Sequence, residues 1–276
     1  MGGANVIPGV SGGTMAIITG IFERLIHAIS ALNFTSLRIL ISGNFKSFSS
    51  RIDLIFLIAL GIGILISIFS ISKILEILLV DFKTLIWAYF FGLIFASIFI
   101  VGRTIKRFTL SVNMFLVFGL LVAVGLLFIN PNTENSSVGY LMLSGAIAMC
   151  SMILPGLSGS FILLIMGNYE LVIHSVSNLN MQVLIPFGVG AIVGLLLFAK
   201  LLSWIFKKYH DHTVGLLTGF IFGSLLILWP WKIENELPNG YTFLLPGINL
   251  ESILSIMLII FGLATVFIIE SISIKK

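Results

Sequence analysis

The feature that most constrains this chain is a set of continuous apolar runs, each long enough to cross a bilayer as a helix of about 20 residues. Membrane-barrel strands instead alternate apolar and polar residues over about ten positions. The chain is therefore predicted to be an all-α, polytopic membrane protein. The runs lie at about 54–73, 84–102, 110–129, 183–206, 213–231 and 251–270.

Composition excludes most soluble classes. Of 276 residues, 58% are hydrophobic and only 9% are charged, against about 25% charged residues in soluble domains. An ordinary cytosolic enzyme, a nucleic-acid-binding module and a disordered tail are therefore excluded. The net charge of +4 is better explained by basic membrane loops than by a nucleic-acid partner. The single cysteine, Cys150, precludes an intramolecular disulfide, and we expect it to be a packing residue.

Two further apolar stretches, 1–30 and 138–177, are each broken near the middle by proline and glycine. The breaks read IPGVSGGT at 7–14 and LPGLSGSF at 154–161. Proline lacks the N–H that the helical ladder needs, and glycine favours turns. Each stretch is therefore predicted to form a helix, a break and a new helix just after it. Broken backbone at membrane depth persists only inside protein or beside a water-filled cavity, so we expect the breaks to be functional.

The two breaks are related by an internal duplication. Shifting the chain by 147 residues aligns 8–33 with 155–180 without a gap, and 12 of these 26 positions are identical. The identities include Pro, Ser, Glu, His and Asn, which a shared apolar composition would not produce. A second shift, of 127 residues, aligns 92–100 with 219–227. Such self-similarity indicates a repeat architecture.

The chain is accordingly read as one membrane domain with two repeats, 1–129 and 138–270, each holding one broken hairpin and three plain spans. A hairpin crosses the membrane either zero times or twice, so each repeat crosses three or five times. Both numbers are odd, so the second repeat enters from the opposite side. This predicts inverted-topology repeats, the plan of many secondary transporters, with re-entrant hairpins at 1–30 and 138–177. The connection around 34–53 is longer than its counterpart.

Charge gives an independent indication of orientation. If successive spans cross the membrane in opposite directions, the loops on one side of the membrane contain only three basic residues: Lys73, Lys83 and Lys232. The other side, called the basic side below, receives ten: Arg38, Lys46, Arg51, Arg103, Lys106, Arg107, Lys207, Lys208, Lys275 and Lys276. By the positive-inside rule the basic side is predicted to be cytoplasmic, and with it the C-terminus.

The start of the chain differs from its counterpart in the second repeat. The second hairpin is led in by an apolar arm, 138–153, whose counterpart would begin before Met1. We expect a truncated N-terminus, and the alternative is that the first hairpin has lost most of one arm. Residues 1–14 lack the basic start and apolar core of a signal peptide.

The breaks offer groups that bind anions. A helix that starts after each break presents N–H groups and the positive end of its dipole. Glycines let an anion approach the backbone, and hydroxyls donate further hydrogen bonds. Two such ends meeting near the midplane would form a cradle for one anionic group. The candidate phosphate ligands are Gly9, Ser11, Gly12, Gly13, Thr14, Gly156, Ser158, Gly159 and Ser160. The alternative is that each motif only caps a helix tip.

Five ionisable residues follow the breaks: Glu23, Arg24, His27, Glu170 and His174. A charge near the bilayer centre costs at least about 2.5–3.5 kcal/mol, so it is usually paired or lines a pathway. Arg24 is a candidate phosphate ligand because it is always protonated and suits phosphate geometry. The glutamates and histidines are candidates for proton coupling or for support of the site. The alternative is that all five lie at the membrane interface.

Other histidine sites are less favoured. A metal site is one further interpretation, because two Glu and two His from paired helices resemble the metal sites of helix bundles. The residues concerned are Glu23, His27, Glu170 and His174. The Glu-x-x-x-His spacing is not the usual Glu-x-x-His, so we expect no metal. His210 and His212, in the basic loop KKYHDH, are expected to be solvated.

Two segments, MGGANVIPGVSGGTMAIITGIFERLI and ILPGLSGSFILLIMGNYELV, resemble the paired signature of the PopT-type polyprenyl-phosphate translocases, formerly a bacterial family of unknown function. The resemblance covers the whole chain. It implies an inner-membrane flippase that returns undecaprenyl phosphate from the outer to the inner leaflet for cell-wall synthesis, without a cofactor. This chain departs from the family pattern in two places. Family members commonly carry an acidic residue where Asn5 stands, and they tend to have an apolar arm before the first motif, which this chain mostly lacks.

The interpretation is therefore a lipid-phosphate translocase in which one repeat rocks against the other. A secondary transporter of a small soluble anion is the alternative, which a closed vestibule facing water would favour. A membrane-embedded lipid phosphatase is less favoured, because the chain has no His-Glu-x-x-His, Ser-His-Asp order or paired-Asp motif. Protons or another ion could drive transport. Neither the coupling ion nor the oligomeric state follows from the sequence.

Overall fold

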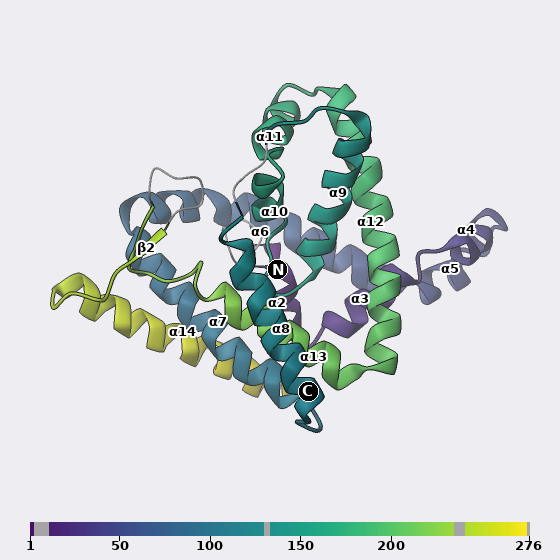
Figure 1. Ribbon diagram of the computed structural model, residues 1–276. Coiled ribbons are helices and arrows are strands. Elements are labelled where there is room, and N and C mark those ends of the chain that lie inside the picture. The colour runs from purple at the N-terminus through teal and green to yellow at the C-terminus, as the bar shows by residue number, and fades with distance from the viewer. Residues whose placement is uncertain (3–10, 130–132, 235–240, 275–276) are drawn as a thin grey trace.

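The computed structural model describes residues 1–2, 11–129, 133–234 and 241–274, and this part of the chain is mainly helical (Figure 1). The helices of the first repeat are α2 (Gly12–Ile18), α3 (Phe22–Ser30), α4 (Phe34–Ile41), α5 (Phe45–Arg51), α6 (Leu54–Asp81), α7 (Lys83–Arg103) and α8 (Leu110–Leu126). The second repeat contains α9 (Val138–Ile153), α10 (Gly159–Ile165), α11 (Tyr169–Ser177), α12 (Met181–Lys208), α13 (His210–Ser224), β1 (Lys232–Glu234), β2 (Tyr241–Phe243) and α14 (Leu250–Ile274).

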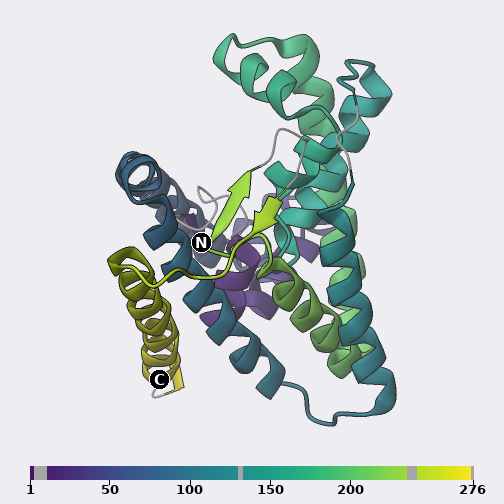
Figure 2. The ribbon, with the colours of Figure 1, turned by 60° about the vertical axis from the view of Figure 1, so that its left-hand side comes forward.

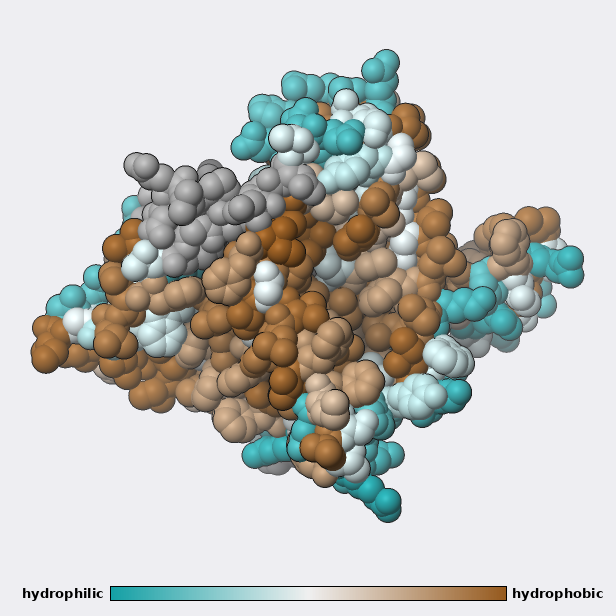
Figure 3. Space-filling model, in the orientation of Figure 1, coloured by the Kyte–Doolittle hydropathy of each residue, from teal (hydrophilic) through white to brown (hydrophobic). Residues whose placement is uncertain are grey.

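Each of the six predicted runs forms a helix: α6, α7, α8, α12, α13 and α14. Among the described residues, three helices are long and apolar enough to cross a membrane alone, and up to six spans result if each bent helix pair counts as one. Apolar side chains cover most of the face in Figure 3, and hydrophilic ones gather at its upper and lower ends and at its right-hand projection. The chain is thus a multi-pass membrane protein of the predicted all-α class.

Two local differences from the prediction have simple causes. The helix α13 ends at Ser224 rather than near residue 231, and residues 225–228 form turns ahead of Pro230, beyond which the helix could not have continued. Beyond it lies a short antiparallel hairpin, in which Lys232 of β1 pairs with Phe243 of β2. The longer connection around 34–53, whose conformation was not predicted, forms the two short helices α4 and α5.

The prediction of one helix after each break is wrong, because each of these segments bends a second time. Residues 12–30 form α2 and α3, and residues 159–177 form α10 and α11, which are bent by 115°. Gly20 and Gly167 lie at these bends with φ of 70° and 74°. This left-handed conformation costs other residues energy but is open to glycine. The two glycines occupy equivalent positions in the sequence alignment, so the second bend is present in both segments.

The long helices pack across the two repeats. The third span of the first repeat, α8, lies along α13, the second span of the second repeat. Reciprocally, α14, the third span of the second repeat, lies along α7, the second span of the first (Figures 1 and 2). In both contacts, the third span of one repeat packs on the second span of the other repeat. The packing is thus reciprocal between the segments that the sequence aligns, and the division into two repeats and their inverted orientation in a membrane stay predictions.

Small residues permit these close contacts. A Cβ placed on Gly119 or Gly219 would overlap backbone carbonyl oxygens across the α8–α13 interface, and one on Gly92 or Gly262 would do the same between α7 and α14. Membrane helices commonly associate through such small residues. On α6, by contrast, a Cβ at Gly63 would meet nothing within 4 Å.

The apolar core surrounds α2. Ala16, which is fully buried, belongs to an apolar cluster that includes Leu217 and Phe220 of α13, and Ile18 belongs to a second cluster that includes Ile94 of α7. The helix that follows the first break is therefore held in the middle of the protein, against helices of both repeats. This placement brings the first break to the second.

Candidate functional site

The described part of the first break, which begins at Ser11, lies against the second break. Ser11 Oγ donates a hydrogen bond to the carbonyl oxygen of Leu154 at 3.1 Å and accepts one from the backbone N–H of Gly13 at 3.1 Å, as the N-cap of α2. Thr14 Oγ1 accepts a hydrogen bond from the backbone N–H of Gly156 at 3.0 Å. Ser11 and Thr14 are buried. The two motifs thus form one polar contact in the interior.

Three of the candidate glycine ligands are required for packing. A Cβ on Gly13 would overlap a carbonyl oxygen at the end of α9, and one on Gly159 would lie 2.8 Å from the carbonyl oxygen of Ala148. A Cβ on Gly156 would lie 2.6 Å from the carbonyl oxygen of Phe220, and its φ of 81° favours glycine. These glycines therefore bring backbone segments together. Gly12 is buried at the start of α2, and Gly9 lies outside the described residues.

A cavity of about 230 Å³ lies beside this contact, between α9, α10, α11 and α12, and is called the break cavity below. Its hydroxyl-bearing residues are Ser11, Ser158, Ser160 and Tyr169, and its remaining lining is apolar. Ser158 Oγ and Ser160 Oγ are hydrogen-bonded at 2.7 Å. A few convergent polar groups in an apolar wall are typical of small-molecule sites.

Arg24 has an intramolecular partner that the sequence did not indicate. Its Nε lies 2.5 Å from Oδ2 of Asp53, and its Nη2 lies 3.1 Å from Oδ1, which makes the pair bidentate. The guanidinium carbon also lies 4.3 Å from the ring centroid of Phe56. Arg24 is therefore bound to the start of α6, and in this conformation a phosphate would have to share or displace Asp53.

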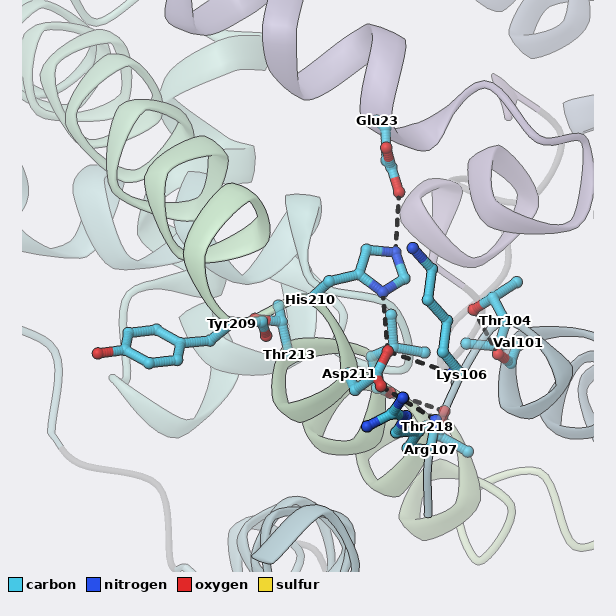
Figure 4. Close-up of polar contacts among 11 residues, drawn as sticks. Glu23, Val101, Thr104, Lys106, Arg107, Tyr209, His210, Asp211, Thr213 and Thr218 are labelled. Atoms are coloured by element: carbon cyan, nitrogen blue, oxygen red, sulfur yellow. Dashed lines mark hydrogen bonds and ion pairs between the residues drawn. The ribbon is translucent and has the colours of Figure 1, made fainter. Parts of the chain in front are cut away.

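Glu23 joins a polar cluster on the other side of α3 (Figure 4). Its Oε1 lies 3.3 Å from Nε2 of His210, whose Nδ1 lies 3.2 Å from Oδ1 of Asp211. His210 is half-buried between two carboxylates, so the expectation that it is solvated is wrong. A histidine in a basic loop gives no local sign of a partner 187 positions away, because that contact depends on the fold.

Asp211 extends this cluster to the connection between α7 and α8. Its carboxylate accepts hydrogen bonds from the backbone N–H groups of Lys106 at 3.2 Å and Arg107 at 3.1 Å. The bond from Lys106, the contact with His210 and the bond from Arg107 lower the pKa of Asp211. The cluster of Glu23, His210 and Asp211 thus connects the first hairpin, the α7–α8 connection and the start of α13.

The remaining ionisable candidates lie on the surface. His27, Glu170 and His174 are exposed, on α3 and α11. His212 is half-buried, with Nε2 3.1 Å from Oγ of Ser111, and is thus not freely solvated either. No group of three or more His, Cys, Asp or Glu side chains that could hold a metal ion is found in the described residues.

The sequence analysis missed a buried amide that fixes the second hairpin. Asn168 is fully buried. Its Oδ1 accepts a hydrogen bond from the backbone N–H of Asn135 at 3.0 Å, and its Nδ2 donates to the carbonyl oxygen of Asn135 at 3.0 Å and to Oγ of Ser144 at 3.3 Å. Tyr140 Oη donates to the carbonyl oxygen of Met166 at 2.9 Å. A polar residue directly after a bend glycine, in an apolar stretch, was the available signal.

Long apolar helices packed around two broken hairpins that meet in the interior define a multi-pass membrane protein of the transporter type. The family model described as "VCA0040-like: Undecaprenyl phosphate translocase-like" matches residues 1–242. The chain belongs to this family, which confirms the resemblance in the sequence.

Two relatives agree with this assignment. The chain is 40% identical over 232 residues to a polyprenyl-phosphate transporter of Vibrio cholerae serotype O1 (strain ATCC 39315 / El Tor Inaba N16961), covering 84% of this chain and 75% of that protein. It is 27% identical over 250 residues to a polyprenyl-phosphate transporter of Staphylococcus aureus (strain NCTC 8325 / PS 47), covering 83% of each. No solved structure matches the chain significantly.

Proposed function

We propose that this protein is a polyprenyl-phosphate translocase of the bacterial inner membrane, with its basic side and C-terminus in the cytoplasm. It returns undecaprenyl phosphate from the outer to the inner leaflet for cell-envelope synthesis. The observation that carries the proposal is membership of a translocase family in which two relatives are named polyprenyl-phosphate transporters. The contact between the two breaks, beside a cavity with hydroxyl groups, supports it.

The phosphate binds in the break cavity, at Ser158 and Ser160. A phosphate at neutral pH offers mainly acceptor oxygens, and hydroxyls can donate to them. The two serine hydroxyls now share one hydrogen bond at 2.7 Å. Both can turn toward a phosphate, so that one neutral bond is exchanged for two charge-assisted bonds, which are about twice as strong. The isoprenoid tail stays in the surrounding lipid.

Passage between leaflets requires that the contact between the breaks opens. Two hydrogen bonds cross it, from Ser11 to Leu154 and from Gly156 to Thr14. Each contributes about 0.5–1.5 kcal/mol, which is small enough for the contact to break and reform during alternating access. Arg24 joins the phosphate site when it exchanges Asp53 for the lipid phosphate. Glu23, Glu170, His27 and His174 couple the cycle to protons or support the site.

The test is transport by purified protein in vesicles, with a membrane-impermeant phosphatase reporting the polyprenyl phosphate that is accessible outside. Ser158→Ala combined with Ser160→Ala is expected to slow translocation at least about tenfold, because two charge-assisted bonds are lost. The control is Ser177→Ala on α11, an exposed serine whose hydroxyl donates to a backbone carbonyl. An unchanged rate in the double variant would refute the site.

The same vesicles separate this proposal from its alternatives. A small-anion transporter would move inorganic phosphate and leave the lipid distribution unchanged. A lipid phosphatase would release inorganic phosphate from polyprenyl phosphate without the added enzyme. The apolar lining of the break cavity, with Met152, Leu163 and Phe187, favours an amphiphile over a hydrated anion.

A further inference from the structure

A second cavity, of about 560 Å³, lies between α8, α12 and α13. We call it the basic-side cavity, because it reaches the turn between α12 and α13, which the charge pattern assigns to the basic side. Its inner end is apolar and is formed by Leu154, Phe198 and Phe220. Its outer end carries the amphipathic residues Trp204 and His212. An apolar body with a polar end at the membrane surface is the shape of a lipid site.

The outer end of this cavity suits an anionic headgroup. Nζ of Lys208 lies 5.4 Å from the ring centroid of Trp204 and 5.2 Å from that of Tyr209, and both rings line the cavity. Beside them, Nε2 of His212 lies 3.1 Å from Oγ of Ser111. The neighbouring carboxylate, Asp211, is already engaged by backbone N–H groups. The rim therefore offers a cation and two hydrogen-bonding side chains, among aromatic residues typical of the membrane interface.

The inner end of the cavity shares its wall with the breaks. Leu154 lines the cavity, and its carbonyl oxygen accepts the hydrogen bond from Ser11. Phe220 also lines it, and the carbonyl oxygen of Phe220 faces Gly156. A lipid tail in this cavity would therefore touch residues that form the contact between the breaks.

The two cavities lie at different depths along α12. The break cavity meets this helix at Phe187, and the basic-side cavity meets it from Phe198 to Ile205. A helix rises about 1.5 Å per residue, so the cavities are separated by about 16 Å or more along the helix axis. The contact between the breaks adjoins both of them. Such an arrangement provides one site on each side of a closed barrier.

We propose that the basic-side cavity is a second polyprenyl-phosphate site, which holds the lipid in the leaflet on the basic side. The phosphate lies at Lys208 and His212, and the first part of the isoprenoid tail lies against Leu154 and Phe220. A phosphomonoester carries about −1.5 to −2 charges near neutral pH, more than the single charge of a phosphodiester lipid, which favours it at this cationic rim. The inference rests on the proposed function and adds to it the site from which the lipid leaves.

The test is binding of undecaprenyl phosphate to the purified full chain in phosphatidylcholine nanodiscs. The wild-type protein is expected to bind two lipids per chain. Lys208→Gln combined with His212→Gln is expected to weaken one site at least about tenfold, through loss of the charge-assisted contacts. Ile205→Trp, which fills the cavity without changing charge, should weaken the same site. Lys207→Gln is the matched control, because Lys207 is likewise an exposed lysine at the end of α12, whereas the contacts with the rings of Trp204 and Tyr209 are made by Lys208.

The outcomes separate this inference from the proposed function. If the rim and filling variants bind two lipids as the wild type does, the second site is refuted, even where Ser158→Ala with Ser160→Ala stops transport. If phosphatidic acid displaces the lipid from this site equally well, the site is a general anionic-lipid contact and the proposal fails. If the wild-type chain neither binds nor moves undecaprenyl phosphate, the proposed function itself fails.

Discussion

The contact between the two breaks can be tested by replacing Thr14 with valine. Valine has nearly the same shape as threonine, so the change removes the hydroxyl without leaving a large cavity. The backbone N–H of Gly156, which now donates to Thr14 Oγ1 at 3.0 Å, would be buried without a partner. An unsatisfied buried donor costs about 1–3 kcal/mol. For a chain of this size, about 1 kcal/mol lowers the melting temperature by about 2–4 °C.

Thr14→Val is therefore expected to lower the apparent melting temperature in detergent by about 2–12 °C, measured at one scan rate. Thr14→Ser is the matched control, because serine keeps the acceptor oxygen and loses only a methyl group. It should retain most of the stability that the valine variant loses. If the serine variant is destabilised as much as the valine variant, packing of the methyl group explains the effect and the hydrogen bond between the breaks does not.

The remaining predictions concern the polar groups around the site. Asp211→Asn should speed amide hydrogen exchange at Lys106 and Arg107, which donate to this carboxylate, and equal exchange in both proteins would contradict the role of Asp211. The pKa of Asp211 is lowered in the folded protein. Its stabilising effect is therefore fully present above its unfolded pKa of about 3.9 and is lost as pH falls through the lower folded pKa. Between about pH 6 and 8, protection of the two amides should not change through titration of Asp211. Asn168→Leu should destabilise the protein by at least about 1–3 kcal/mol, because it leaves the backbone groups of Asn135 unpaired. Thermal unfolding beside the exposed control Asn178→Leu would measure this difference, and equal melting temperatures would contradict it.

Local signals in the sequence were sufficient for the long apolar helices and for the break at 154–158. The membrane sets the length of a spanning helix, so the long apolar runs predicted α7, α12 and α14 directly. Proline and glycine together mark a break, so 154–158 was recognised. A single glycine in an apolar run gives a weaker signal, and the second bends at Gly20 and Gly167 were missed even though the duplication aligned them.

The partners of the charged side chains could not be predicted in the same way. Arg24 pairs with Asp53 and Glu23 pairs with His210 only because α3 lies beside the start of α6 and the start of α13. The packing of the helices determines these contacts, and one sequence contains no covariation to indicate them. The sequence therefore indicated which residues carry chemistry near the breaks, but not which of them are already neutralised by the protein.

The reciprocal packing of α8 on α13 and of α14 on α7 has a consequence for the bodies that move. Each sequence repeat gives its third span to the other repeat, so the two halves interlock and cannot separate as they were duplicated. Glycines at Gly92 and Gly219 hold backbone against backbone in these pairs, and close-packed interfaces of this kind do not slide easily. Under the proposed translocase function, we therefore predict that the units that move together are the mixed pairs, α7 with α14 and α8 with α13, rather than the two sequence repeats.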